Sequence, residues 1–127
     1  MHYTPFVAVL SLVLFFVFTA LVGRARGKYG VKAPATTGNA DFERVFRVQQ
    51  NTLEQLMLFL PALWIFGSTI SDMWAAILGI AWITGRVLYA TGYYKEASAR
   101  GKGFVLSIGA TGILLIGSLI KTVMLLV

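Results

Sequence analysis

Hydrophobic residues in this chain form four long runs separated by short polar connections. The runs cover Thr4–Gly23, Asn51–Ser71, Met73–Tyr94 and Gly103–Val127. Each is close to the roughly 20 residues that an α-helix needs to cross a bilayer. The pattern predicts an all-α integral membrane protein, in which residues 1–127 form a single domain built as a bundle of four transmembrane helices.

Composition strengthens the membrane prediction and excludes several classes of site. Hydrophobic residues make up 57% of the chain and the mean hydropathy is +0.77, which is too apolar for a soluble domain of this size. The chain has no cysteine, so it has no disulfide, no thiol nucleophile of its own and no Cys-based metal site. We expect no metal cofactor.

The basic residues lie mostly in the connections between the hydrophobic runs and do not form a patch. The net charge is +6, but no basic face interleaved with aromatics is apparent, which argues against nucleic acid as a partner and favours contacts with membrane lipids. The connections after the first and third runs carry seven cations, whereas the connection after the second run has only Asp72. The positive-inside rule then places both basic connections at the cytoplasmic face of a multi-pass protein, which in a bacterium would be in the inner membrane. The seven cations are Arg24, Arg26, Lys28, Lys32, Lys95, Arg100 and Lys102.

Two polar stripes enter the membrane from that face. Residues 29–40 have turn composition, and Asp41 is the predicted N-cap of the second helix. From there, polar residues recur at i, i+3, i+7 and i+10, which is one face of a helix. A similar stripe is predicted on the third helix. The first stripe is Arg44, Arg47, Asn51 and Glu54, and the second is Arg86, Tyr89, Tyr93, Glu96 and Arg100.

The stripes lie at the same depth and predict a pocket with more arginines than acids. Arginine binds carboxylates through two parallel hydrogen bonds, so a small molecule with several carboxylates would suit this pocket. Structural roles are equally open. Glu54 could simply pair with Arg86 or Arg47, because charges within a membrane usually pair. The two tyrosines could belong to the aromatic belt, and Arg100 could be an ordinary cation beside the membrane.

Aromatic and small residues predict contacts with lipid and between helices. We expect the three tryptophans, Trp64, Trp74 and Trp82, to face lipid or the interface. Small residues at Gly103, Ser107 and Thr111, and again at Gly109 and Gly112, would let the last helix pack closely against another.

Two segments resemble a known family. The sequence FERVFRVQQNTLE at residues 42–54 resembles the signature of the MAPEG family, the membrane-associated proteins in eicosanoid and glutathione metabolism. The segment Arg86–Arg100 resembles the family's third-helix pattern, in which two tyrosines four apart precede an arginine seven residues on.

The resemblance implies a homotrimer that binds glutathione between neighbouring subunits. It further implies that Tyr93 and Arg100 act at the glutathione thiol, where a cation favours the nucleophilic thiolate. Tyr93 is also among the residues that it implies bind glutathione. These are Arg26, Arg47, Gln49, Asn51, Glu54, Tyr89 and Tyr93.

A function in detoxification follows as a hypothesis. The protein would be a glutathione S-transferase that attacks lipophilic electrophiles, or a glutathione peroxidase that reduces lipid hydroperoxides. The alternative is a non-catalytic lipid-binding or scaffold protein of the same fold.

Overall fold

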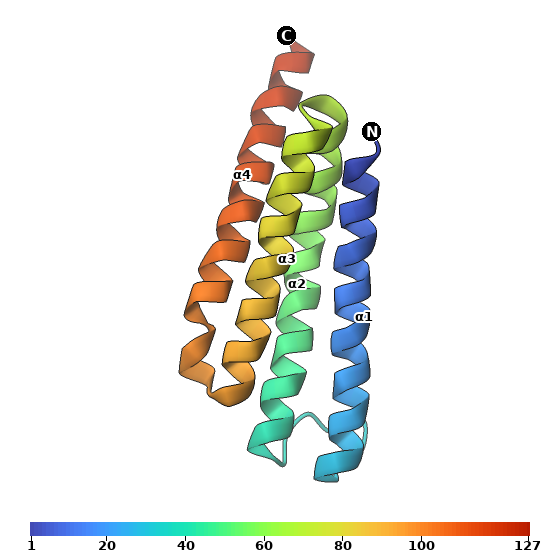
Figure 1. Cartoon of the computed structure of the whole chain (residues 1–127), viewed down its shortest axis with the longest axis vertical. Helices are drawn as coiled ribbons and strands as arrows, with labels where there is room; N and C mark the ends of the chain where they lie inside the picture. Colours follow the sequence, from blue (N-terminus) through green and yellow to red (C-terminus); the bar gives the residue numbers. More distant parts are fainter.

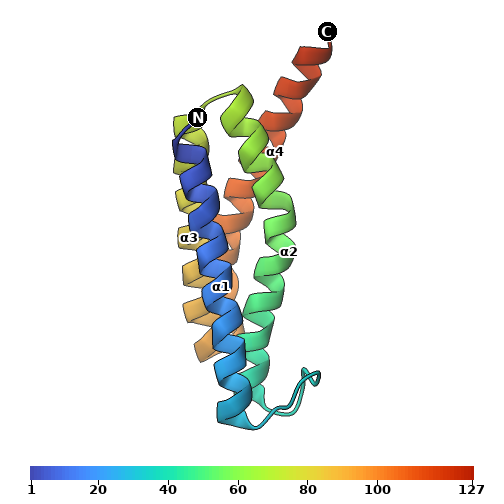
Figure 2. The same cartoon turned by 90° about the vertical axis from the view of Figure 1, so that its right-hand side faces the viewer.

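The computed structural model describes all 127 residues as a bundle of four long helices without strands (Figures 1 and 2). A single 3₁₀ turn, η1, stands between the last two helices. The all-helical prediction is confirmed. The elements are α1 (Tyr3–Tyr29), α2 (Ala40–Thr69), α3 (Asp72–Lys95), η1 (Ala97–Arg100) and α4 (Gly101–Leu126).

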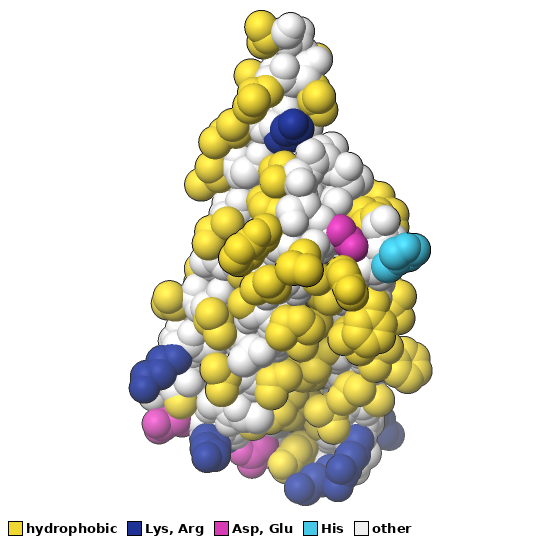
Figure 3. Space-filling model, turned by 45° about the horizontal axis from the view of Figure 1, so that its top comes forward, with side chains coloured by type: hydrophobic (Ala, Val, Ile, Leu, Met, Phe, Trp, Pro, Cys, Tyr) yellow, Lys and Arg dark blue, Asp and Glu magenta, His cyan; other side chains and the backbone are white.

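The connections are distributed over the two ends of the bundle as predicted. The α1–α2 loop and the α3–α4 turn lie at one end, and both termini and the α2–α3 turn lie at the other (Figure 1). Lysine and arginine side chains gather toward the first end, below a broad hydrophobic surface (Figure 3). The stretches 3–29, 72–95 and 97–126 are long and apolar enough to cross a membrane. Helix α2 is as long but more polar, because its first half carries the first stripe.

The N-cap of α2 differs from the predicted residue. The N-cap of α2 is Asn39, whose side chain accepts a hydrogen bond of 3.0 Å from the backbone N–H of Phe42. The prediction of Asp41 is therefore wrong. Asp41 lies in the first turn, where it pairs with Arg44 and where a carboxylate suits the helix dipole. At the other end of the loop, Gly30 terminates α1 with φ of 68°, the left-handed conformation that glycine adopts most readily.

The Asp72 carboxylate ties α1 to α3 at the end of the bundle that holds the termini. It accepts hydrogen bonds from the backbone N–H groups of His2, Tyr3 and Thr4 at 2.8 to 3.0 Å. The Thr4 hydroxyl adds a fourth bond of 2.7 Å. One side chain of α3 thus satisfies the N–H groups that the start of α1 leaves free.

The core lies between α2 and α3. The rings of Phe59 and Trp82 stack with their centroids 4.1 Å apart and their planes 6° apart. Trp82 has no exposed surface, so its predicted position facing lipid is wrong. Trp64 and Trp74 are 48% and 60% exposed, as predicted. The three tryptophans differ because only Trp82 lies on the inner face of its helix.

Helices α3 and α4 approach closely through small residues. Gly103, Ser107 and Thr111 are all buried. A Cβ on Gly103 would overlap the backbone of Tyr89 on α3, and one on Gly85 would lie 2.7 Å from the backbone nitrogen of Ser107. The first predicted ridge is confirmed, and its partner is α3 of the same chain. The second, at Gly109 and Gly112, packs against nothing within the chain, because a Cβ at either position would meet no atom within 4 Å.

The second polar stripe does not lie on one continuous helix. Helix α3 ends at Lys95, Glu96 is extended, and Arg100 belongs to η1. The helical spacing of the stripe therefore does not extend to Glu96 and Arg100, and Arg100 lies in the connection between α3 and α4, where the pattern of runs placed it. The turn reverses the chain and packs so tightly on Gly92 that a Cβ there would overlap the carbonyl of Ala99.

Replacing Gly103 by alanine should therefore destabilise the bundle. The added methyl group would collide with backbone rather than with a mobile side chain, and we expect a loss of about 1–3 kcal/mol. Gly109 is the matched control, because a Cβ there meets nothing within 4 Å. Gly109→Ala should be neutral or stabilising, since alanine is the better helix former. Thermal unfolding of both variants in detergent tests this, and equal stability of the two would contradict it.

Candidate functional site

A polar pocket opens at the basic end of the bundle, where α2, α3, η1 and the start of α4 meet. It has a volume of about 370 Å³. Two arginines, an asparagine and three aromatic rings line it: Arg47, Asn51, Tyr89, Tyr93, Arg100 and Phe104. Five of the eight residues predicted for the site are thus brought together.

The guanidinium of Arg86 supports the inner wall of this pocket. The residue has no exposed surface. Its Nη2 donates hydrogen bonds to the side-chain oxygens of Asn51 at 2.7 Å and Thr52 at 3.0 Å. Nη1 donates to the Ser107 hydroxyl at 3.4 Å, and the guanidinium carbon lies 4.2 Å from the centre of the Tyr89 ring. Arg86 therefore orients two residues of the pocket wall from behind.

The hydrogen bond from Arg86 also determines what Asn51 can offer. Its amide oxygen is occupied by Arg86, which leaves the amide nitrogen as a donor toward the pocket. Asn51 is therefore suited to an oxygen of a ligand rather than to an ammonium group.

The pocket is positive throughout. Arg47 is exposed at its rim. Arg100 lies over the Tyr93 ring, 5.5 Å from the ring centre, and donates a hydrogen bond to the carbonyl of Ala97. No carboxylate lines the pocket. Two cations at the surface and a third beneath them would attract an anionic ligand.

Glu54 lies outside the pocket and has no partner within the chain. It is exposed, and the one ion pair of the structure joins Arg44 to Asp41. The interpretation of Glu54 as an ion-pair partner of Arg86 or Arg47 is therefore wrong. The two terminal nitrogens of the buried Arg86 guanidinium donate to neutral oxygens instead, and its Nε has no partner within the chain.

Arg26 and Gln49 also lie away from the pocket. The guanidinium of Arg26 donates to the carbonyl oxygens of Val31 at 3.4 Å and Ala35 at 2.7 Å, in the α1–α2 loop. The Gln49 amide nitrogen donates to the Thr19 hydroxyl on α1 at 3.2 Å. The structure thus divides the predicted site between two surfaces of one chain.

Sequence reasoning missed Phe104 and underestimated Arg86. Phe104 lies in an apolar run and nothing in its spacing marks it. Its ring centre is 6.3 Å from that of Tyr89, so it completes the aromatic wall. Arg86 stood in the second stripe, but its role as a buried support depends on contacts across three helices.

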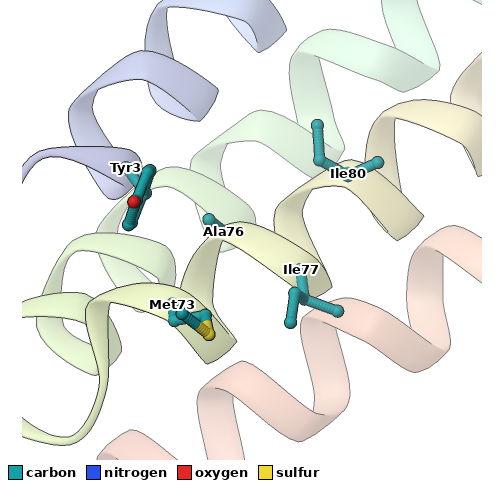
Figure 4. A pocket seen from close by; sticks show the side chains of 5 residues that line it. All are labelled: Tyr3, Met73, Ala76, Ile77 and Ile80. Carbon is teal, nitrogen blue, oxygen red and sulfur yellow. The ribbon is translucent and has the colours of Figure 1, made fainter.

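Other hollows of the surface lie outside this pocket, and two of them are apolar. One of about 340 Å³ lies between the start of α1 and α3 and has no charged lining (Figure 4). Its lining is Tyr3, Met73, Ala76, Ile77 and Ile80. Another of about 520 Å³ lies between α1 and α2 and is lined by leucines, Phe15, Met57 and Pro61. No cluster of three or more His, Asp or Glu residues that could hold a metal is present.

Comparisons with known proteins agree with this architecture. The model of the MAPEG family matches residues 4–120. An uncharacterized protein of Synechocystis is 53% identical over 91% of this chain and 84% of its own length. Human microsomal glutathione S-transferase 2 is 44% identical over 89% of this chain and 78% of its own. Bovine leukotriene C4 synthase is 33% identical over 85% of this chain and 78% of its own.

The different surroundings of Asn51 and Glu54 predict opposite effects on stability. Asn51→Ala removes an acceptor from a buried guanidinium and should destabilise the unliganded protein by about 1–3 kcal/mol. Glu54→Gln on the same helix removes no contact within the chain and should destabilise the unliganded protein less than Asn51→Ala does. Thermal unfolding in detergent without ligand measures both. A larger loss for Glu54→Gln than for Asn51→Ala would contradict the assignment.

Proposed function

The chain belongs to the MAPEG family, and from that premise we propose that it is a membrane-embedded glutathione transferase acting on lipophilic electrophiles. The observation that carries the proposal is the positive pocket in which Arg47, Asn51, Tyr89, Tyr93 and Arg100 converge. The relatives named for glutathione transfer and for leukotriene C4 synthesis support it.

The pocket suits the chemistry of glutathione. This tripeptide carries two carboxylates, one ammonium group and a thiol. Arg47 at the rim would bind a carboxylate, and the free amide nitrogen of Asn51 would donate to a carboxylate or peptide oxygen. Tyr89 and Tyr93 would form the wall against which the peptide lies. Glu54 supplies a carboxylate for the ammonium group on the same exposed side of α2.

Arg100 is the residue that we assign to the sulfur. A thiol with a pKa near 8.5 is mostly protonated at neutral pH, and a nearby cation favours the thiolate. The thiolate sulfur then forms a bond to an electrophilic carbon of the second substrate. In a substitution the carbon–leaving-group bond breaks, and the leaving anion and the thiol proton go to solvent. In an addition the C=C π bond or the epoxide C–O bond opens, and the proton ends on the product. Tyr93, in contact with Arg100, can donate a hydrogen bond to the same sulfur.

The groove between α1 and α2 offers a place for the second substrate. It is lined by seven residues without an ionisable group, a surface suited to the hydrocarbon part of the bilayer. A lipophilic electrophile would reach it directly from the bilayer. A lipid hydroperoxide could do so equally, in which case two glutathione molecules would reduce it to the alcohol and water and leave as the disulfide. A lipid carrier without catalysis could use the same groove, and thiolate formation distinguishes the two.

One chain presents only part of the site, so we propose that neighbouring subunits complete it. An exposed carboxylate halfway along a helix of a membrane protein is costly unless a partner covers it, and Glu54 is such a group. Arg26 on α1 and Gln49, whose amide donates to Thr19 on α1, are the residues that a second copy would contribute. The family resemblance points to a homotrimer. The basic end, with the pocket, would face the cytoplasm.

Replacing Arg100 by alanine should lower turnover while leaving glutathione binding largely intact. Loss of the cation raises the pKa of the bound thiol, and each unit lowers the thiolate fraction at neutral pH about tenfold. Raising the pH should partly restore turnover. The measurements are thiolate absorbance on adding glutathione and turnover of an aromatic electrophile across pH. Lys102→Ala removes an exposed cation of the same connection and should have no effect.

The tyrosine hydroxyl is the competing source of thiolate stabilisation. If Tyr93→Phe shows the defect that high pH rescues, and Arg100→Ala turns over like the unmodified protein at neutral pH, then our assignment of Arg100 is wrong.

A shared site predicts that two inactive subunits can complement each other. Arg26→Ala and Arg100→Ala subunits should each form impaired oligomers. When the two are co-expressed, each shared site takes Arg26 from one subunit and Arg100 from its neighbour. With random assembly, one such site in four has both arginines intact. Activity should return to about a quarter of the unmodified level with random assembly. Activity no higher than the average of the two homo-oligomers would show that each chain uses its own residues alone.

A further inference from the structure

A second positively charged hollow lies on the opposite side of α2 from the glutathione pocket. It has a volume of about 230 Å³ and is formed by the last two turns of α1 together with one residue each from α2 and α3. Val45 lines this hollow, whereas Arg47 lines the glutathione pocket. Residues two apart on an α-helix point in nearly opposite directions, so the two hollows are separate. The full lining is Leu21, Arg24, Ala25, Lys28, Tyr29, Val45 and Tyr94.

Two unpaired cations stand at this hollow. Arg24 and Lys28 are both exposed and lie one helical turn apart on α1. The one ion pair of the structure lies elsewhere, between Arg44 and Asp41. The ammonium group of Lys28 lies 5.3 Å from the centre of the Tyr29 ring, which keeps it beside the hollow. An anion placed here would find two positive charges without a competing carboxylate among the lining residues.

The remaining walls are apolar and continue toward the membrane interior. Leu21 and Ala25 lie on the same face of α1 as Arg24 and Lys28. Ala25 lies between the two cations, and Leu21 lies one turn closer to the hydrophobic run. Arg24 is the first charge after the twenty uncharged residues 4–23, so it stands where the hydrocarbon region ends. The hollow therefore joins a cationic part at headgroup level to an apolar part at the level of the upper acyl chain.

We propose that this hollow is a binding site for an anionic phospholipid. The lipid phosphate would lie between Arg24 and Lys28, and the start of an acyl chain would lie against Leu21 and Val45. The combination of charge and apolar wall favours a lipid over a free phosphate, because a soluble anion would use only the two cations. The bilayer also supplies the lipid at high local concentration. This inference does not depend on the proposed transferase activity.

Lipid binding to the purified full-length protein tests the proposal. The protein in nonionic detergent is titrated with phosphatidylglycerol, with phosphatidylcholine of the same acyl chains, and with glycerol 3-phosphate. Bound lipid is counted by native mass spectrometry, and melting temperature is followed in parallel. Phosphatidylglycerol alone should bind and raise the melting temperature. Equal binding of phosphatidylcholine, or saturation by glycerol 3-phosphate, would overturn the proposal in favour of a nonspecific lipid surface or a soluble-anion site.

A matched pair of double variants separates a built site from general surface charge. Arg24→Gln with Lys28→Gln should weaken phosphatidylglycerol binding about 30-fold. Lys95→Gln with Lys102→Gln removes the same charge from exposed positions at the same end of the bundle and should weaken it less than about threefold. Equal losses in the two variants, or no loss in the first, would refute the site.

Photolabelling provides a test that needs no variant. Phosphatidylglycerol with a photoactivatable group near the start of its acyl chain should label the segment 21–29 or Val45. Labelling confined to other surfaces would contradict the proposal even if the double variant failed to fold. Glutathione is absent from all these measurements, so their outcome is independent of the proposed enzyme activity.

Discussion

The structure depends on one buried charge. The guanidinium of Arg86 has no exposed surface and no carboxylate partner, so neutral side-chain oxygens and ring faces must replace the water it loses. Those oxygens come from Asn51 and Thr52 on α2 and from Ser107 on α4. Because all of them must face Arg86 at once, the rotation of α2 and α4 about their axes is restricted. The rotation that turns Asn51 inward also places Arg47 at the rim of the pocket.

Close backbone packing brings the other half of the pocket into place. Gly85 and Gly103 let α3 and α4 approach so closely that a single added methyl group would not fit. Gly92 lets the η1 turn lie directly on α3. This tight reversal returns Arg100 to the level of Tyr93, although the helix that carries Tyr93 ends at Lys95. The cation at the proposed sulfur position is therefore held by a turn that small residues make possible.

The surface of α2 links the site to assembly. Its inner face is fixed by Arg86 and by the stacked rings of Phe59 and Trp82, so its remaining polar groups are forced outward. Glu54 is among them, exposed and unpaired within the chain. In lipid such a group is costly without a partner. Arg26 on α1 and Gln49, whose amide donates to Thr19 on α1, lie on a different surface of the chain. The proposed site between subunits would bring these two surfaces together.

The sequence by itself determined the helices and the end of the bundle at which the candidate site lies. Run lengths and cation positions depend on local hydrophobicity and on where charges interrupt it, which are properties of the chain alone. The polar stripes with their tyrosines and arginines also identified Arg47, Asn51, Tyr89, Tyr93 and Arg100 as one group. Only the tertiary structure decided that Arg86 supports the pocket from within, that Glu54 stands free, that Trp82 is buried and that Arg100 arrives through a turn. Each of these depends on which face of a helix meets another helix, and such contacts between distant parts of the chain leave no periodic signal in the sequence.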